Sequence, residues 1–246
     1  MKLPNSKKNG ELKSRINLPA SKLPTSNLLG EFHESFSWRI FRIMSEFVDG
    51  FQFLANFNEV KTVTFFGSAR FSEDSHWYQV ARQLGTLLGE NDYGVVTGGG
   101  PGIMEAGNRG AFEGGGESIG INIKLPFEQR INQYVKKSIG FHYFFSRKTM
   151  LSYSAQAFVY FPGGFGTLDE FFELVTLLQT NKIPNKIPVI CVGKEYWEPL
   201  LSWVDQSIYG KFQAIDKEDQ LIYTIVDTAE EAFEIIKKTP HIKYFS

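Results

Sequence analysis

One glycine-rich turn, followed by a threonine and a glutamate, carries the residue types best suited to chemistry in this chain of 246 residues. The turn at 162–166 reads Pro-Gly-Gly-Phe-Gly and lies between an expected strand at 157–161 and an expected helix at 167–180. Glycine lets backbone N–H groups approach a ligand closely, and a helix N-terminus adds partial positive charge. The turn and Thr167 therefore predict a phosphate-binding site.

Glu170 lies one helical turn beyond this site. A carboxylate placed on the phosphate itself would be repelled, so Glu170 is expected to face a group that becomes cationic. The anomeric carbon of a ribosyl group does so, because glycoside cleavage has oxocarbenium character. A carboxylate can stabilise that cation or activate water. The structural alternative is a capping box formed by Thr167 and Glu170, which are three residues apart.

A second glycine loop at 98–102 follows an expected strand at 93–97 and opens an expected helix at 103–112. The dinucleotide fingerprint G-x-G-x-x-G fails because position 103 is isoleucine, and the chain contains no G-x-x-x-x-G-K-[ST] motif. Two such loops in one sheet favour a phosphate site over plain turns. Gly107 and Gly110, inside the helix, indicate close packing on the sheet or on a ligand.

Two side chains on this helix have two interpretations each. Met104 is expected either to pack against a base or to lie in the core. Glu105 is expected either to contact ribose hydroxyls or to form an ion pair with Arg109, four residues later on the helix.

Arg147 and Lys148 begin an expected helix at 146–154. Cations at a helix N-terminus oppose its dipole, so an anion is expected nearby unless the pair is simply solvated. Arg147 can bind phosphate with two parallel hydrogen bonds or orient a carboxylate. Arg70 follows the loop at 67–69 and is expected at the same edge of the sheet.

The alternation of strands and helices predicts an α/β fold, a doubly wound parallel sheet with helices on both faces, whose ligands bind at the carboxyl ends of the strands. Strands are expected at 61–66, 93–97, 118–123, 138–144, 157–161, 187–192 and 221–226. Helices are expected at 77–88, 103–112, 146–154, 167–180, 196–208 and 229–237.

The N-terminal region is expected to be organised differently. Residues 1–28 predict a flexible basic tail, and 29–58 predict a helical extension whose apolar face covers the main domain or pairs with a second copy. Residues 59–246 form the expected nucleotide-binding catalytic domain.

Composition excludes several classes of function. The 26 basic and 27 acidic residues nearly cancel, so no basic field indicates nucleic acid. No apolar run approaches the about 20 residues that cross a bilayer, so no membrane association is expected. Cys191, the single cysteine, lies in an apolar run and is expected to be buried and inert, which favours a cytoplasmic protein. The four histidines lack metal-ligand spacing, and no metal site is expected.

The stretch 162–170 matches P-G-G-x-G-T-x-x-E, and on it the chain resembles the LOG family, the cytokinin riboside 5'-monophosphate phosphoribohydrolases. Many members of this family were once labelled lysine decarboxylases. Three further segments resemble family motifs in the same order: 66–70, 98–105 and the pair Arg147-Lys148. The resemblance covers roughly residues 60–240.

The resemblance implies a Rossmann-like fold, a homodimer or larger homo-oligomer, and no metal or organic cofactor. The implied reaction is hydrolysis of the N-glycosidic bond of a purine or cytokinin nucleoside 5'-monophosphate to free base and ribose 5-phosphate, with Arg147 and Glu170 as the catalytic pair. Short plant members have glycine at the position of Glu105, and many have tyrosine at that of Phe165. The resemblance therefore does not identify the base of the substrate, and an AMP nucleosidase is one possibility.

Loop positions and resemblance together predict one set of residues that bind substrate or phosphate. These are Gly67, Ser68, Arg70, Gly99, Gly100, Gly102, Met104, Glu105, Lys148, Gly163, Gly164, Gly166 and Thr167. The main alternative function is a non-catalytic protein that binds or carries a nucleotide or phosphorylated cofactor. Such a protein needs the glycine loops but not the Glu170 carboxylate. A lysine decarboxylase would need pyridoxal phosphate on a Schiff-base lysine, and Lys148 is the one lysine expected in the pocket.

Overall fold

The computed structural model describes residues 28–124, 131–183 and 187–241. The chain divides into two compact units between Arg42 and Ile43, within helix α1 (Leu28–Ala55). In the first unit the side chains of Trp38 and Phe41 are exposed. Of the predicted basic tail, residues 1–27 lie outside the described residues, and the predicted domain limits stay predictions.

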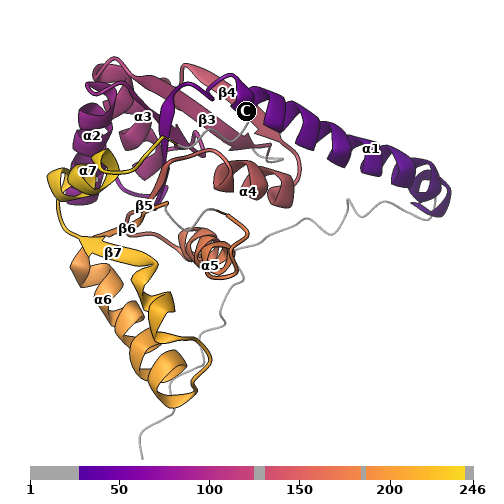
Figure 1. Cartoon of the computed structure of the whole chain (residues 1–246). Helices are drawn as coiled ribbons and strands as arrows, with labels where there is room; N and C mark the ends of the chain where they lie inside the picture. The colour runs from indigo at the N-terminus through magenta and orange to yellow at the C-terminus, as the bar shows by residue number, and fades with distance from the viewer. Residues whose placement is uncertain (1–27, 125–130, 184–186, 242–246) are drawn as a thin grey trace, which may run out of the picture. The chain divides into compact units, whose positions relative to one another are not determined.

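The second unit is built on one sheet of seven parallel strands in the order β4-β3-β2-β1-β5-β6-β7 (Figure 1). The strands are β1 (Lys61–Phe66), β2 (Tyr93–Thr97), β3 (Glu117–Ile123), β4 (Lys137–Phe141), β5 (Ala157–Tyr160), β6 (Val189–Val192) and β7 (Tyr223–Val226). Central strands such as β5 and β6 are buried throughout, as expected for apolar runs covered on both faces. The predicted α/β class is confirmed.

Helices cover both faces of the sheet. They are α2 (His76–Gly89), α3 (Ile103–Glu113), α4 (Phe144–Ser152), α5 (Phe165–Gln179), α6 (Lys194–Trp203) and α7 (Ala229–Lys237), with a π-helix at Val204–Lys211 and a 3₁₀-helix at Lys217–Leu221. Helices α2, α3 and α7 pack on one face, while α4, α5 and α6 pack on the other (Figure 1). None of the helices in the described ranges is both long and apolar enough to cross a membrane.

The alternating side chains of the strands separate the core into layers. Val63 and Phe65 of β1 join the layer beneath α2, α3 and α7. Phe158 and Tyr160 of β5 face the opposite way, into the layer that contains Trp197 of α6. Trp197 is fully buried, and its indole Nε1 donates a hydrogen bond to the Tyr160 carbonyl at 3.1 Å. This bond satisfies the polar end of a large buried ring.

The two glycines inside α3 mark close helix contacts. A Cβ atom at Gly107 would lie 2.6 Å from the Phe65 ring of β1, and one at Gly110 would lie 2.0 Å from the Arg82 carbonyl of α2. These contacts confirm the close packing on the sheet predicted for α3, and they extend it to a neighbouring helix.

Several element boundaries differ from the predictions, and three of the differences concern α4, α5 and α6. The strand predicted at 138–144 ends at Phe141, and α4 begins at Phe144, because the aromatic residues 143–145 resemble a strand in propensity but start a helix. Helix α5 begins two residues before the predicted position. The helix predicted at 196–208 is α-helical only to Trp203 and then continues as a π-helix.

Candidate functional site

The site lies between β1 and β5. From β1 the chain adds strands toward one edge of the sheet, and from β5 it adds them toward the other. Strands β1 and β5 are neighbours, but the helix that follows β1 packs on one face of the sheet and the helix that follows β5 packs on the other. The loops after these strands therefore diverge and leave a crevice at the carboxyl ends, where open α/β sheets bind ligands. A cavity of about 960 Å³ occupies this crevice and is lined by both loops.

The glycine turn after β5 forms one wall of the cavity. Helix α5 begins at Phe165 with Gly164 as its N-cap, and in the described structure no side chain caps it. A Cβ atom at Gly164 or Gly166 would meet no described atom within 4 Å. The first N–H groups of a helix have no partner within the helix, so those of α5 are available to an anion.

Thr167 does not cap α5, so the capping-box interpretation is wrong. The helix begins at Phe165, which makes Thr167 its third residue and places Glu170 in its second turn. Thr167 is buried, and both residues line the cavity. A Cβ atom at Gly163 would lie 2.1 Å from the Thr167 hydroxyl, so glycine is needed for this close approach.

Arg147 reaches the cavity from α4. Its Nε donates a hydrogen bond to the Ile121 carbonyl of β3 at 2.8 Å, which fixes the guanidinium. A Cβ atom at Gly98 would lie 2.2 Å from Arg147 Nη2, so glycine at the end of β2 makes room for this side chain. Burial lowers the pKa of Arg147, and the charge of Glu170 opposes this change.

The anion expected near the start of α4 is supplied by the protein. The Glu46 carboxylate accepts hydrogen bonds from the backbone N–H groups of His142 and Tyr143 and from the Ser146 hydroxyl. It therefore satisfies donors at the start of the helix that carries Arg147 and Lys148. Glu46 was not among the predicted residues, because its sequence separation from α4 gives no local signal.

Glu170 has an unusual environment for a carboxylate. Its backbone carbonyl accepts a hydrogen bond from the Tyr160 hydroxyl at 3.1 Å. Burial raises the pKa of the Glu170 carboxyl to about 7; Lys148 and Arg147 oppose the rise, while Glu173 and Asp169 add to it. Near neutral pH the group therefore exists in both protonated and ionised forms, as suits a general acid or base.

Lys148 lines the cavity, but its ammonium group is already paired. The Nζ atom lies 2.9 Å from Asp169 Oδ2 and 2.7 Å from Glu173 Oε2. Burial favours the neutral amine, yet the contacts with the carboxylates of Glu173 and Asp169 prevail and raise the pKa of Lys148. A Schiff-base lysine must become a neutral amine, so this environment does not fit pyridoxal phosphate chemistry.

The second glycine loop, 98–102, supports the site from behind, and of its residues only Gly98 lines the cavity. Gly99 and Gly102 have φ values of 70° and 69°, which favour glycine, and Ile103 N donates to the Ser68 carbonyl of the β1 loop at 3.0 Å. A buried network holds the loop from behind, since Asn132 Nδ2 donates to the Gly100 carbonyl and to Asn108 Oδ1, both at 3.0 Å.

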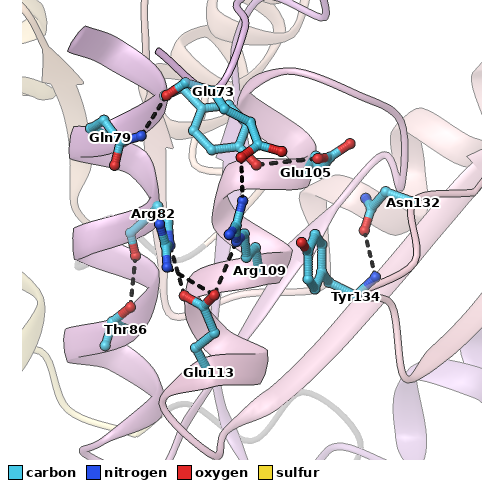
Figure 2. A network of polar contacts seen from close by, with 10 residues as sticks. Glu73, Gln79, Arg82, Thr86, Glu105, Arg109, Glu113, Asn132 and Tyr134 are labelled. Carbon is cyan, nitrogen blue, oxygen red and sulfur yellow. Dashed lines mark hydrogen bonds and ion pairs between the residues drawn. The ribbon is translucent and has the colours of Figure 1, made fainter. Parts of the chain in front are cut away.

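Glu105 points into a different network. It accepts a hydrogen bond from the Tyr78 hydroxyl of α2 at 3.2 Å. The ion pair predicted between Glu105 and Arg109 is wrong, because Arg109 pairs with Glu73 at 2.7 Å and with Glu113 at 3.0 Å (Figure 2). These pairs link α3 to the segment before α2 and to its own last turn.

The cavity thus unites most of the predicted site residues. Among the described residues that line it are Gly67, Ser68, Arg70, Met104, Arg147, Lys148, Gly163, Gly164, Gly166, Thr167 and Glu170. Gly99, Gly100, Gly102 and Glu105 are not in this lining. Their roles toward a substrate stay predictions.

Two polar side chains in the cavity lining, those of Asp169 and Tyr196, were not predicted as site residues. Asp169 occupies an unspecified position of the motif P-G-G-x-G-T-x-x-E, so the motif alone gives it no role. Tyr196, near the start of α6, donates a hydrogen bond from its hydroxyl to the Gly163 carbonyl at 2.8 Å and so supports the glycine turn. Its signal was its position just after β6, because every loop after a parallel strand reaches this edge.

The described residues contain no group of three histidine, cysteine, aspartate or glutamate side chains able to hold a metal ion. A parallel sheet with an uncapped glycine turn, a buried arginine and a carboxylate at the switch point defines a Rossmann-like protein with a cavity suited to a phosphorylated ligand. Residues 104–236, more than half of the chain, match the model of the family described as "Possible lysine decarboxylase". The chain belongs to this family. LOG proteins are among the relatives of the chain.

Three relatives are cytokinin riboside 5'-monophosphate phosphoribohydrolases by name. A probable one from Oryza sativa is 32% identical over 139 residues, which are 55% of this chain and 56% of the rice protein. The match therefore spans little more than half of the rice protein. One from Rhodococcoides fascians is 27% identical over 62% of this chain and 78% of its own length. One from Arabidopsis thaliana is 27% identical over 74% and 83%.

Two solved structures share the fold. The protein TM1055 is 29% identical, with a TM-score of 0.55 over 73% of this chain and 99% of its own. The molybdenum cofactor carrier protein of Chlamydomonas reinhardtii is 21% identical, with a TM-score of 0.54 over 73% of this chain and 97% of its own. At this identity the second likeness shows the fold alone.

Proposed function

We propose that this protein hydrolyses the N-glycosidic bond of a nucleoside 5'-monophosphate and releases free base and ribose 5-phosphate. The observation that carries the proposal is that Arg147 and Glu170 line the same cavity as the uncapped N-terminal turn of α5. A binding protein needs the turn, but it does not need a buried carboxylate that exchanges a proton near neutral pH. The activity named for the relatives agrees with this proposal.

The proposed mechanism assigns each group a separate task. The 5'-phosphate binds the free amides at the start of α5, the Thr167 hydroxyl and the Arg147 guanidinium. Glu170, one turn further along α5, then faces the sugar. As the bond from the anomeric carbon to the base nitrogen breaks, the ionised carboxylate stabilises the oxocarbenium character and accepts a proton from the attacking water. The departing nitrogen takes up a proton from solvent, and the proton that Glu170 accepted returns to solvent.

The base is proposed to lie against the apolar part of the cavity wall. Met104, Phe144 and Phe165 are among the lining residues there, and Phe144 and Phe165 are exposed at 59% and 93%. Aromatic faces stack on any base, so this wall alone does not select one. AMP and an isopentenylated AMP are both candidate substrates.

The test is incubation of the purified protein with AMP, other nucleoside monophosphates, isopentenyl-AMP and the matching nucleosides, followed by chromatography for free base. Release from monophosphates but not from nucleosides is expected. The Arg147→Gln and Glu170→Gln variants are each expected to lose at least about 100-fold in rate. Nucleotide binding without release of base from any substrate would instead indicate a binding or carrier protein.

The protein is further proposed to act as a homo-oligomer in the cytoplasm. Phe165 and Phe172 of α5 are exposed at 93% and 39%, and they flank Leu168 on the same helix. Exposed apolar side chains grouped in this way favour burial against a second copy. The single cysteine is buried and its pKa is raised by burial, as suits a thiol without a redox role.

A further inference from the structure

The ammonium group of Lys148 lies between two carboxylates, and Glu170 is neither of them. Lys148 Nζ forms ion pairs with Asp169 and Glu173, which flank Glu170 along α5. The Lys148 side chain is only 19% exposed, whereas that of Asp169 is 64% exposed and that of Glu173 is 33% exposed. The pair with Glu173 is therefore the shorter and the better protected of the two.

Charged and titratable groups face Glu170 from three elements. Arg147 and Lys148 approach from α4, Asp169 and Glu173 from α5 itself, and the Tyr160 hydroxyl from β5. Two positive and two negative groups thus surround a buried carboxylate. Among these carboxylates, the ammonium group most strongly stabilises the ionised form of the one that it contacts directly. The reason is that the attraction falls with distance and that burial limits screening.

We propose that Glu173 is a positioning residue. It holds the Lys148 ammonium group in an ion pair, so that Lys148 does not pair with the Glu170 carboxylate and Glu170 stays available as the base. The inference rests on the proposed function, and it deepens that proposal by naming a residue that controls the same site. It assigns Lys148 to the support of Glu170 rather than to the substrate phosphate.

Opposite shifts in the titration of Glu170 follow from this arrangement. Glu173→Gln removes a negative charge and frees Lys148 to turn toward Glu170, so both changes favour the ionised carboxylate. Lys148→Met removes the positive charge and favours the protonated form. A role limited to packing would not move the titration in opposite directions.

The experiment is an NMR titration of the Glu170 side-chain carboxyl carbon in protein labelled with ¹³C-glutamate, assigned by its loss in Glu170→Gln. The midpoint is expected to fall by about one pH unit in Glu173→Gln and to rise in Lys148→Met. Asp169→Asn, at the more exposed partner, is expected to lower it by less. Glu234→Gln, an equal loss of charge on α7, is the matched control and is expected to leave the midpoint unchanged.

The pH dependence of base release is measured beside it, and its acidic limb is expected to move with the carboxyl titration. A midpoint in Glu173→Gln equal to that of the control, or shifts of the same sign in Glu173→Gln and Lys148→Met, would overturn the inference. Because the titration needs no turnover, the two proposals can fail separately. The expected shifts without base release would refute only the phosphoribohydrolase activity, and base release with an unmoved midpoint would refute only the role of Glu173.

Discussion

Burial of the Glu170 carboxyl has a consequence for stability as well as for chemistry. Its pKa rises from an ordinary 4.5 to about 7, so the native protein binds this proton more tightly than the unfolded chain does. The stability that this group contributes is therefore complete below about pH 4.5 and is lost as the pH rises through 7. Above that range a charge remains buried at a cost.

Glu170→Gln removes this cost while keeping the shape of a protonated glutamate. The variant is expected to match the wild type in free energy of unfolding at pH 4.5 and to exceed it at pH 8, by up to about 3 kcal/mol, since each pKa unit corresponds to about 1.4 kcal/mol. Urea unfolding at the two pH values measures the difference. If the two proteins differed in free energy of unfolding by the same amount at both pH values, the pKa of Glu170 would not be raised by folding.

Tyr196→Phe tests the support of the glycine turn. The change keeps the ring but removes the hydroxyl that donates to the Gly163 carbonyl, a bond worth about 1 kcal/mol. The KM for a monophosphate substrate is expected to rise about fivefold, with a smaller change in kcat, because the loss falls on the phosphate turn. Steady-state kinetics would show this split, and Tyr209→Phe, outside the described cavity lining, serves as the control.

At the residue scale the sequence predicted the side chains whose chemistry is local. Short motifs near strand ends include Arg147, Thr167 and Glu170, and all three residues line the cavity. Interactions between distant segments were missed, as with Glu46 at the start of α4. The Glu105–Arg109 pair failed for a related reason: helical spacing shows which side chains can meet, but Glu73 from another segment competes for the same arginine.

At the scale of elements, the contact between α2 and α3 is set by glycine. Gly110→Ala would place a Cβ atom 2.0 Å from the Arg82 carbonyl, a backbone atom that cannot move without its helix. The overpacking is expected to destabilise the protein by about 1–3 kcal/mol, although alanine favours an isolated helix by about 1 kcal/mol. Gly166→Ala in α5 meets no described neighbour within 4 Å and is expected to keep or raise stability in the same urea assay.

The strands and helices followed from the sequence because their apolar periodicity is strong. Strands β1 and β2 and helix α7 have the predicted limits, and the limits of the remaining predicted elements differ by a few residues. The shifts occur where local chemistry is ambiguous: aromatic residues begin α4, and glycines precede α5. The close approach of α2 and α3 could be expected from two glycines in one helix, but the partner of Gly110 could not.

For the whole molecule, the apolar face of α5 predicts self-association. Phe172→Asp introduces a charge beside Phe165 and Leu168 and is expected to weaken assembly by at least about tenfold in the dissociation constant. Light scattering after size-exclusion chromatography measures the change in mass. Phe212→Asp, at a more exposed aromatic in the π-helical region, is the control, and equal effects of both variants would place the interface elsewhere.

Cys191 lies on β6 and is fully buried, and it is the single cysteine of the sequence. The native protein therefore presents no thiol to a maleimide or methanethiosulfonate reagent without unfolding. Any cysteine introduced at an exposed position, such as that of Ala69, would be the sole labelling site. The wild-type chain is thus already a suitable background for spin labels or fluorophores placed at the rim of the cavity.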